Sequence, residues 1–253
     1  LDGDISFKWT AFSSYYDQLR AGIRHLVDET GATKVCSMYI PSDFGLEVHE
    51  ATVDEAEALG IEYADETQHR PDEQEFVGAI QRLRDSGCQI VSMGIAVRPI
   101  IIALGTAKRL GWDDVVFIGS SAGMNTVIAK VPEGVTEGYY AAAGWVDFEA
   151  RLDVPEVAEW AQAYQAAHGE PVGTAAQLGY GAAKTLVQAL EAAGQDLNPD
   201  TFRTAMQGIA YYDPINDTDL NYGEDHQGSN LVVISQIRDG MWHEVARVEQ
   251  EAE

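Results

Sequence analysis

Four short apolar runs rich in Val and Ile recur at a fixed spacing, and this regularity constrains the fold more than any other feature of the sequence. The runs start at Lys34, Ile61, Cys88 and Val115, so each start lies 27 residues after the one before it. In each interval, apolar residues recur three or four positions apart, which predicts an amphipathic helix. Strands that alternate with helices in this way pair in parallel through right-handed crossovers. The sequence therefore predicts an α/β fold with a doubly wound parallel sheet over residues 34–121.

Other elements are expected outside this block. They are a helix at 15–27, a strand at 135–146, helices at 154–168, 173–193 and 199–208, and a C-terminal β-hairpin with strands at 230–237 and 241–246. Asp239-Gly240 is a residue pair that favours the tight turn of a hairpin. Turn-forming residues fill 211–219, which predicts a loop. The helix at 173–193 is apolar on more than one face, which predicts packing against a sheet, but few strands remain after residue 135 to cover it.

Composition excludes several classes of function. The chain has 253 residues, 41 Asp plus Glu against 16 Lys plus Arg, and a net charge of −25. A hydrophobic content of 45% is too high for a disordered chain. Because no basic stripe is present to neutralise a phosphate backbone, we expect no nucleic-acid partner. No run of 18 apolar residues occurs, so we expect no membrane insertion.

Neither the cysteines nor the histidines form a recognisable chemical motif. Cys36 and Cys88 fit one disulfide or two buried thiols, and their places at the start of apolar runs favour thiols. The six His are dispersed and no His-Glu-x-x-His or Cys-x-x-Cys occurs, so we expect no metal site. The glycines at 105, 111 and 119 do not form a dinucleotide-binding motif, and no cofactor is expected.

Several short motifs, taken in order and spacing, resemble one known family. They are Met38–Glu47, Pro71–Phe76, Ile118–Ser121, Glu137–Tyr139 and Asp225–Ser229. Together they resemble the branched-chain amino-acid-type substrate-binding proteins of ABC transporters, which have the two-lobed, type I periplasmic binding fold. The resemblance implies a periplasmic binding protein and not an enzyme. Its implied partners are a small-molecule ligand, held between the lobes by hinge closure, and the membrane permease of an ABC importer.

The resemblance also implies a division of the chain. Residues 1–135 and 230–253 are expected to form the second lobe, and residues 136–229 the returning helical part of the first lobe. In this interpretation the N-terminal part of the first lobe, which carries its sheet, is missing, and so is a signal peptide. The chain is therefore expected to be a fragment of a longer protein.

Candidate ligand-binding residues follow from the rule that open α/β sheets bind ligands at the carboxyl ends of their strands. The expected residues are Asp43 and Phe44 after the first strand, Ala96, Val97 and Arg98 after the third, and Ser120, Ser121 and Asn125 after the fourth. By resemblance, Phe44 matches an aromatic position that packs on the ligand. It is equally compatible with a hydrophobic staple at the start of a helix. Arg98 could hold a carboxylate or be a solvated surface group.

Two departures from the family pattern bear on the ligand. Ala96 stands where amino-acid-binding members often have Tyr, and Ser121 stands where they have a Glu that pairs with the ligand ammonium. Loss of that carboxylate removes a charge-assisted bond of about 1.5–3 kcal/mol, which puts a leucine-like ligand in doubt. Serine hydroxyls and helix N-terminal N–H groups favour oxygens instead, so an aromatic acid or an amide is competitive. Ser120 and Ser121 are equally compatible with a helix N-cap.

Two other functions stay open. Gly119-Ser-Ser-Ala-Gly123 fits the Gly-x-Ser-x-Gly elbow of serine hydrolases, with Ser121 as nucleophile and His226 or His243 as a formal base. A ligand-sensing receptor or regulatory module with the same fold is the other alternative.

Overall fold

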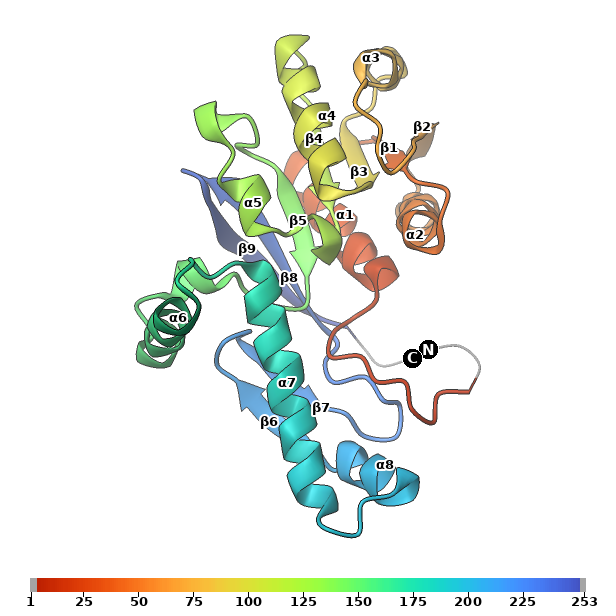
Figure 1. Cartoon of the computed structure of the whole chain (residues 1–253). Coiled ribbons are helices and arrows are strands. Elements are labelled where there is room, and N and C mark those ends of the chain that lie inside the picture. The colour runs from red at the N-terminus through yellow and green to blue at the C-terminus, as the bar shows by residue number, and fades with distance from the viewer. Residues whose placement is uncertain (1–3, 251–253) are drawn as a thin grey trace. The chain divides into compact units, whose positions relative to one another are not determined.

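The computed structural model describes residues 4–250, which divide into two compact units (Figure 1). The sheet unit comprises residues 14–143 and 232–248, and the helical unit comprises residues 4–13, 144–231 and 249–250. The expected boundary after residue 135 differs from the observed one after residue 143, because the intervening segment supplies a strand to the sheet. The first described residues also lie in the helical unit. The assignment of the two units to the two lobes of the related family stays a prediction.

The sheet unit contains a seven-stranded sheet in the order β2-β1-β3-β4-β5-β8-β9. The strands are β1 (Lys34–Tyr39), β2 (Glu62–Gln68), β3 (Ile90–Gly94), β4 (Val116–Gly119), β5 (Tyr140–Ala143), β8 (Leu231–Arg238) and β9 (Met241–Glu249). The first five pair in parallel, and β8 pairs antiparallel with β5. The predicted doubly wound α/β sheet and C-terminal hairpin are therefore confirmed, and Asp239 and Gly240 both adopt positive φ at the hairpin turn.

Several helices of the sheet unit begin or end where the sequence supplies a cap. They are α1 (Tyr15–Thr30), α2 (Asp43–Leu59), α3 (Val77–Asp85), α4 (Val97–Arg109), the short α5 (Thr126–Ala129) and two 3-10 turns, η1 (Ser121–Gly123) and η2 (Pro132–Gly134). The Ser14 side chain accepts the N–H of Asp17 and caps α1. Gly60 ends α2 in the left-handed conformation, at φ 67°.

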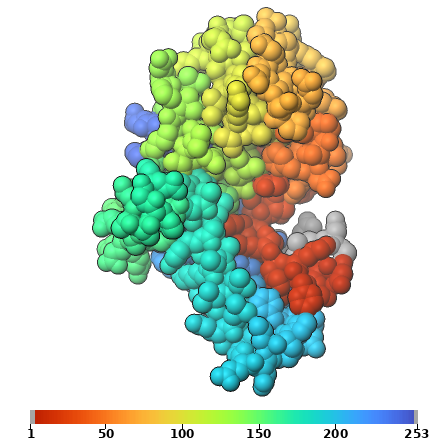
Figure 2. All heavy atoms as spheres, in the orientation of Figure 1, coloured from red at the N-terminus to blue at the C-terminus, as the bar shows by residue number. Residues whose placement is uncertain are grey.

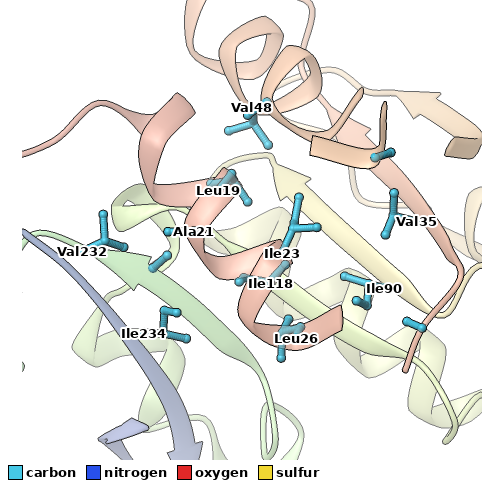
Figure 3. Close-up of a cluster of buried hydrophobic side chains, with 14 residues drawn as sticks. Leu19, Ala21, Ile23, Leu26, Val35, Val48, Ile90, Ile118, Val232 and Ile234 are labelled. Carbon is cyan, nitrogen blue, oxygen red and sulfur yellow. The ribbon is translucent and has the colours of Figure 1, made fainter. Parts of the chain in front are cut away.

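The core of the sheet unit lies between α1, α2 and one face of the sheet (Figure 3). Leu19, Ile23 and Leu26 recur on one side of α1, and each is at most 1% exposed. They pack with strand residues such as Ile90 and Ile118. Right-handed crossovers place α3 and α4 on the opposite face.

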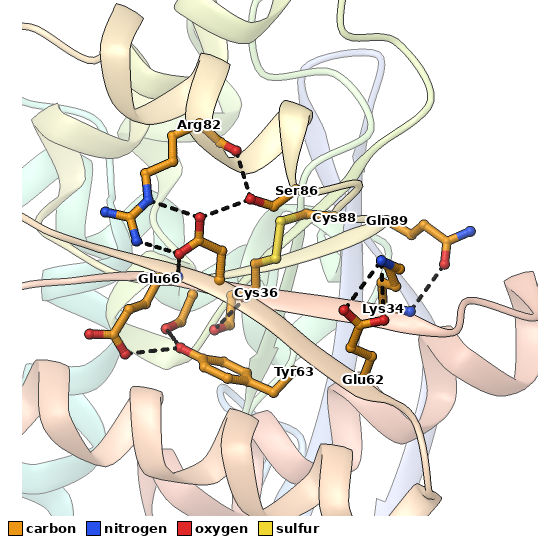
Figure 4. The surroundings of a disulfide bond; sticks show 12 residues. Lys34, Cys36, Glu62, Tyr63, Glu66, Arg82, Ser86, Cys88 and Gln89 are labelled. Carbon is orange, nitrogen blue, oxygen red and sulfur yellow. Dashed lines mark hydrogen bonds and ion pairs between the residues drawn. A yellow bond between two sulfur atoms is a disulfide. The ribbon is translucent and has the colours of Figure 1, made fainter.

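A disulfide joins Cys36 to Cys88, so the expectation of free thiols was wrong (Figure 4). In the parallel pairing of β1 with β3, Cys36 lies opposite Val91, and Cys88 lies in the loop just before β3. The two Cα atoms lie 5.8 Å apart, within the range that a disulfide bridges. The positions of the two cysteines in apolar runs did not reveal the disulfide, because which cysteines meet depends on the order of the strands in the sheet.

The helical unit contains the 3-10 turn η3 (Phe148–Arg151), helices α6 (Pro155–His168), α7 (Thr174–Ala193) and α8 (Pro199–Gln207), and a hairpin of β6 (Ala210–Asp213) and β7 (Thr218–Asn221). The three helices match their predicted positions. The hairpin replaces the loop that was expected at 211–219, because the turn formers occupy only its tip, where Asp217 has a φ of 56°.

Candidate functional site

The order of the strands singles out one edge of the sheet unit. In the order β2-β1-β3-β4-β5, the chain leaves β1 toward one face of the sheet and leaves β3 toward the other. The loops after β1 and β3 therefore diverge at a topological switch point, which is where ligands bind in folds of this type. We call the segments 41–44, 95–98 and 120–125, together with the N-terminal turn of α1, the carboxyl edge.

Two aromatic rings meet at the carboxyl edge. The ring of Phe44, in the first turn of α2, contacts the ring of Tyr15, in the first turn of α1, edge to face at a centroid distance of 5.1 Å. Both side chains are half-buried and pack beside the core. Burial raises the pKa of the Tyr15 phenol, so the group stays neutral at physiological pH. Asp43 precedes Phe44, is exposed, and lies in the acidic first turn that a helix favours.

Helix α4 begins at the carboxyl edge without a side-chain cap. Ala96 occupies the N-cap position, and because its methyl side chain has no oxygen it cannot cap the N–H groups of the first turn. Val97 is half-buried, whereas Ala96 and Arg98 are exposed. Within residues 4–250, the Arg98 guanidinium makes no ion pair. The edge thus combines the N–H groups of Val97 and Arg98, which have no side-chain cap, with the positive end of a helix dipole and an arginine that makes no ion pair within the described residues.

The serine pair after β4 divides into one buried and one partly exposed residue. Ser120 is 0% exposed, and its Oγ has no hydrogen-bond partner among the described residues. Ser121 is half-exposed, and its N–H donates to the Gln18 Oε1 at 2.9 Å. A solute at the surface reaches Ser121 and not Ser120, so we leave Ser120 out of the contact set that we propose.

Asn125 has a capping role, as the side chain at the start of α5. Its Oδ1 accepts the N–H of Val127 at 2.9 Å, and its carbonyl accepts the indole N–H of Trp242 at 3.2 Å. The side chain is half-buried. The first turns of α2 and α5 thus each have one side-chain cap, whereas those of α4 and of the 3-10 turn η1 have none.

The glycines of the Gly-x-Ser-x-Gly pattern have a packing role. A Cβ at Gly119 or at Gly123 would overlap the hydroxyl of Tyr139, which lies between them. Tyr139 is 2% exposed, and burial raises the pKa of its phenol. The proposed base His226 has its Nδ1 2.8 Å from the Ile5 carbonyl oxygen. These contacts account for the glycines of the motif without a nucleophile.

Sequence reasoning missed three residues at or beside the carboxyl edge. Tyr15 and Gln18 come from the helix that precedes the first strand, so no strand-end rule points to them. His69 directly follows β2 and is 5% exposed. Its N–H donates to the carbonyl of Tyr39, and its Nε2 lies 2.8 Å from the hydroxyl of Thr67. Burial lowers the pKa of His69, and nearby Glu73 partly opposes this.

Comparison with known proteins identifies the family. The family model described as periplasmic binding protein matches residues 4–241, almost the whole chain. The chain belongs to the periplasmic binding protein family. This membership confirms the resemblance found in the sequence motifs. The members of this family are substrate-binding proteins of ABC transporters. No curated protein sequence matches the chain.

Solved periplasmic binding proteins share the fold at low sequence identity. A fatty acid ABC transporter substrate-binding protein from Thermomonospora curvata is 21% identical with a TM-score of 0.86, over 97% of this chain and 66% of that one. A branched-chain amino acid ABC transporter protein from Thermus thermophilus with bound valine is 19% identical with a TM-score of 0.83, over 96% and 67%. A solute-binding protein from R. palustris in complex with benzoate is 15% identical with a TM-score of 0.80, over 94% and 66%.

The chain spans about two thirds of the length of these solved periplasmic binding proteins, while nearly all of it is matched. Among residues 4–250, no helix has the length and apolar content that crossing a bilayer requires. Within the same residues, no three His, Cys, Asp or Glu side chains are grouped where they could hold a metal ion.

Proposed function

We propose that this chain is the solute-binding part of an ABC importer and that its solute is a small organic acid, bound at the carboxyl edge by closure of two lobes. The observation that carries the choice of an acid is the start of α4. There the unpaired Arg98 stands beside a helix N-terminus without a side-chain cap. A carboxylate supplies the acceptor oxygens and the negative charge that these groups lack.

The neighbouring residues favour an acid without an amino group. An ammonium needs a carboxylate partner, and the neutral Ser121 stands where amino-acid-binding relatives have Glu. The Tyr15–Phe44 ring pair adds an apolar surface at the same edge, against which a ring or an alkyl chain can pack. The ligands named for the similar structures include benzoate, a fatty acid and valine, which share a carboxylate.

The disulfide supports a location outside the cytoplasm. Disulfides persist in oxidising compartments such as the periplasm, and the two cysteines of this chain are joined in one. The partner that follows from this function is the membrane permease of the importer. A ligand-sensing module would bind its ligand at the same edge, so binding to a permease is the property that distinguishes the two functions.

A ligand titration followed by NMR tests the proposal. We expect benzoate and octanoate to shift the amide signals of residues 97–98, 121 and 44, and benzylamine to shift none of them. Arg98→Gln should weaken benzoate binding at least tenfold, because it removes the cation. Arg84→Gln is the matched control, since Arg84 is exposed at the end of α3, at the opposite edge of the sheet.

Ser121→Glu provides the converse test. It places a carboxylate beside the proposed site, so it should weaken benzoate and strengthen valine relative to benzoate. Equal binding of benzylamine and benzoate by the unchanged chain, or shifts that map away from the carboxyl edge, would count against an organic acid as the solute.

A further inference from the structure

The turn after β4 is held by a side chain from a distant part of the sequence. The N–H of Ser121 is the first N–H group of η1, and it donates to the Oε1 of Gln18, on α1, at 2.9 Å. Ser120 occupies the N-cap position of η1, but its own side chain makes no capping bond. Gln18 therefore does for this turn what an N-cap residue does for most helices, although 103 residues separate it from Ser121.

Gln18 occupies a buried place in which an apolar side chain would be the ordinary choice. It is 1% exposed and belongs to the buried side of α1, with Leu19 and Ile23. A buried amide destabilises a fold unless its polar atoms are hydrogen-bonded. The peptide N–H of Ser121 requires an acceptor, which orients the amide with its Oε1 toward the turn. The bond to Ser121 accounts for a polar side chain at this position.

The first turn of α1, which precedes Gln18, is fixed by two side chains. The Ser14 hydroxyl accepts the N–H of Asp17 at 3.0 Å, and the Glu47 carboxylate, on α2, accepts the N–H of Tyr16 at 3.1 Å. In Figure 2, red atoms of α1 are visible between the orange atoms of α2 and the yellow-green atoms of the segment after β4. Gln18 thus extends from a rigid support, which a side chain that positions another residue needs.

A glycine brings α1 close enough to β4 for this contact. A Cβ at Gly22 would lie 2.5 Å from the Cδ1 of Ile118, so the helix backbone packs directly on the strand (Figure 3). Gln18 lies one helical turn before Gly22, and β4 ends at Gly119. The close approach therefore places the Gln18 amide beside the residues that follow the strand.

The bond to Gln18 decides which group of Ser121 a solute can meet. The Ser121 N–H is directed at a buried amide, so a solute at the surface does not reach it. The Ser121 side chain is half-exposed, and its hydroxyl can donate to a carboxylate oxygen. The place of this hydroxyl depends on the conformation of the turn, which the Gln18 bond maintains.

We propose that Gln18 is a positioning residue for the solute, because its amide holds the turn after β4 so that the Ser121 hydroxyl, and not the Ser121 N–H, meets the carboxylate of the organic acid. The inference rests on the proposed function and adds to it a residue behind the carboxyl edge. Gln18 is too deeply buried to contact the solute and acts through Ser121.

A double-mutant cycle with Ser121 tests this role. Gln18→Met keeps the length of the side chain and removes the acceptor. We expect it to weaken benzoate binding at least threefold and to speed hydrogen exchange of the Ser121 amide, measured without ligand, at least tenfold. Ser121→Ala removes the hydroxyl that Gln18 positions. In the Ser121→Ala background, Gln18→Met should therefore cause no further loss of benzoate affinity.

Thr52→Val is the matched control for a lost buried hydrogen bond in the same unit. The Thr52 hydroxyl is buried and lies 2.6 Å from the Ser92 hydroxyl, in the middle of α2 and β3 and not at the carboxyl edge. This variant should lower the urea midpoint without changing the benzoate affinity or the exchange of the Ser121 amide. It separates a general loss of stability from a positioning effect.

Two results would overturn the proposal. One is a Gln18→Met variant in which the Ser121 amide exchanges as slowly as in the unchanged chain. The other is a loss of benzoate affinity from Gln18→Met that is equally large with and without the Ser121 hydroxyl. If Gln18→Met does not fold, Gln18→Asn, whose shorter amide cannot reach the Ser121 N–H, replaces it with the same expectations.

Failure of the proposed function gives a different result. In that case benzoate does not bind the unchanged chain, whereas the exchange experiment needs no ligand. Faster exchange of the Ser121 amide in Gln18→Met would then still support Gln18 as the residue that holds the turn, and unchanged exchange would contradict it.

Discussion

Helices α1 and α7 both carry long apolar faces, but only one of these faces is buried. In α1, Ile23 is 0% exposed against the seven-stranded sheet, whereas in α7 Leu186 is 49% exposed. The buried side of α7 is instead small and polar, around Gln177 and Thr185. The same periodic signal in the sequence thus corresponds to a completed core in the sheet unit and to an open surface in the helical unit.

This difference shows where the folding energy of the chain resides. Burial of a large aliphatic side chain stabilises a fold by about 1.5–3 kcal/mol, and the sheet unit gains this repeatedly along α1 and α2. The outer half of α7 gains little of it. The helical unit depends instead on hydrogen bonds such as those of Gln177, each worth about 1 kcal/mol net.

Truncation of matched side chains gives the largest expected contrast. Ile23→Ala leaves a cavity in the core and should lower the free energy of unfolding of the sheet unit by about 2–5 kcal/mol. Leu186→Ala removes an exposed side chain and should change stability by no more than about 0.5 kcal/mol. Urea titrations measure the unfolding of each unit separately. The indole signal of Trp112 reports the sheet unit, and that of Trp160 reports the helical unit. A cost for Leu186→Ala as large as that for Ile23→Ala would mean that α7 is already covered.

Removal of the disulfide should affect the two units differently. Cys36 and Cys88 are 52 residues apart in sequence and both lie in the sheet unit. Closing a loop of this length stabilises a fold by about 2–4 kcal/mol, mainly by restricting the unfolded chain. We expect the Cys36→Ser/Cys88→Ser double variant to lower the free energy of unfolding reported by the Trp112 signal by that amount, and so to lower its urea midpoint. An equal fall in the Trp160 midpoint would show instead that the units unfold together.

The sequence predicted the fold of the sheet unit well because periodicity there reports burial. The 27-residue spacing and the apolar runs predicted the four parallel strands β1 to β4, and Asp239-Gly240 located the last turn. The strand β5 was predicted separately, outside the parallel block that it joins. Sequence reasoning failed where a feature depends on which segments lie side by side in the folded chain. Cys36 meets Cys88 through strand order, and the four-residue strands of the β6–β7 hairpin are too short to show a period.

The candidate site was predicted in outline and not in detail. The strand-end rule selected the loops after β1, β3 and β4, and these strands are confirmed, whereas ligand binding at the loops stays a prediction. It could not separate the buried Ser120 from the partly exposed Ser121, because both follow the same strand. It also missed Gln18, which reaches Ser121 from a helix 103 residues earlier.

Two glycine substitutions test the same contrast between the sheet unit and the helical unit, with smaller expected changes in stability. Gly119→Ala puts a methyl group where the Tyr139 hydroxyl lies and should cost about 1–3 kcal/mol. Gly179→Ala on α7 meets nothing within 4 Å and should stabilise the helical unit by about 0.5–1 kcal/mol, since Ala is the better helix former. Thermal unfolding of both variants measures the difference. Tyr139→Phe should recover part of the Gly119→Ala loss, because the ring carbon Cζ lies 3.3 Å from the added Cβ; no recovery would place the clash elsewhere.

A pH titration gives the smallest expected effect, and it is specific to the sheet unit. Burial lowers the pKa of His69 below its ordinary value of 6.5, so the folded state favours the neutral ring. The unfolded chain takes up the proton first as pH falls. The stability that depends on neutral His69 is therefore complete above pH 6.5 and declines as the pH drops from there toward the lowered pKa. Urea midpoints of the Trp112 signal between pH 8 and pH 5 should show this decline, and His69→Gln should flatten it. A decline that persists in His69→Gln would assign the pH dependence to other groups, and one that appears equally in the Trp160 signal would show that the two units are coupled.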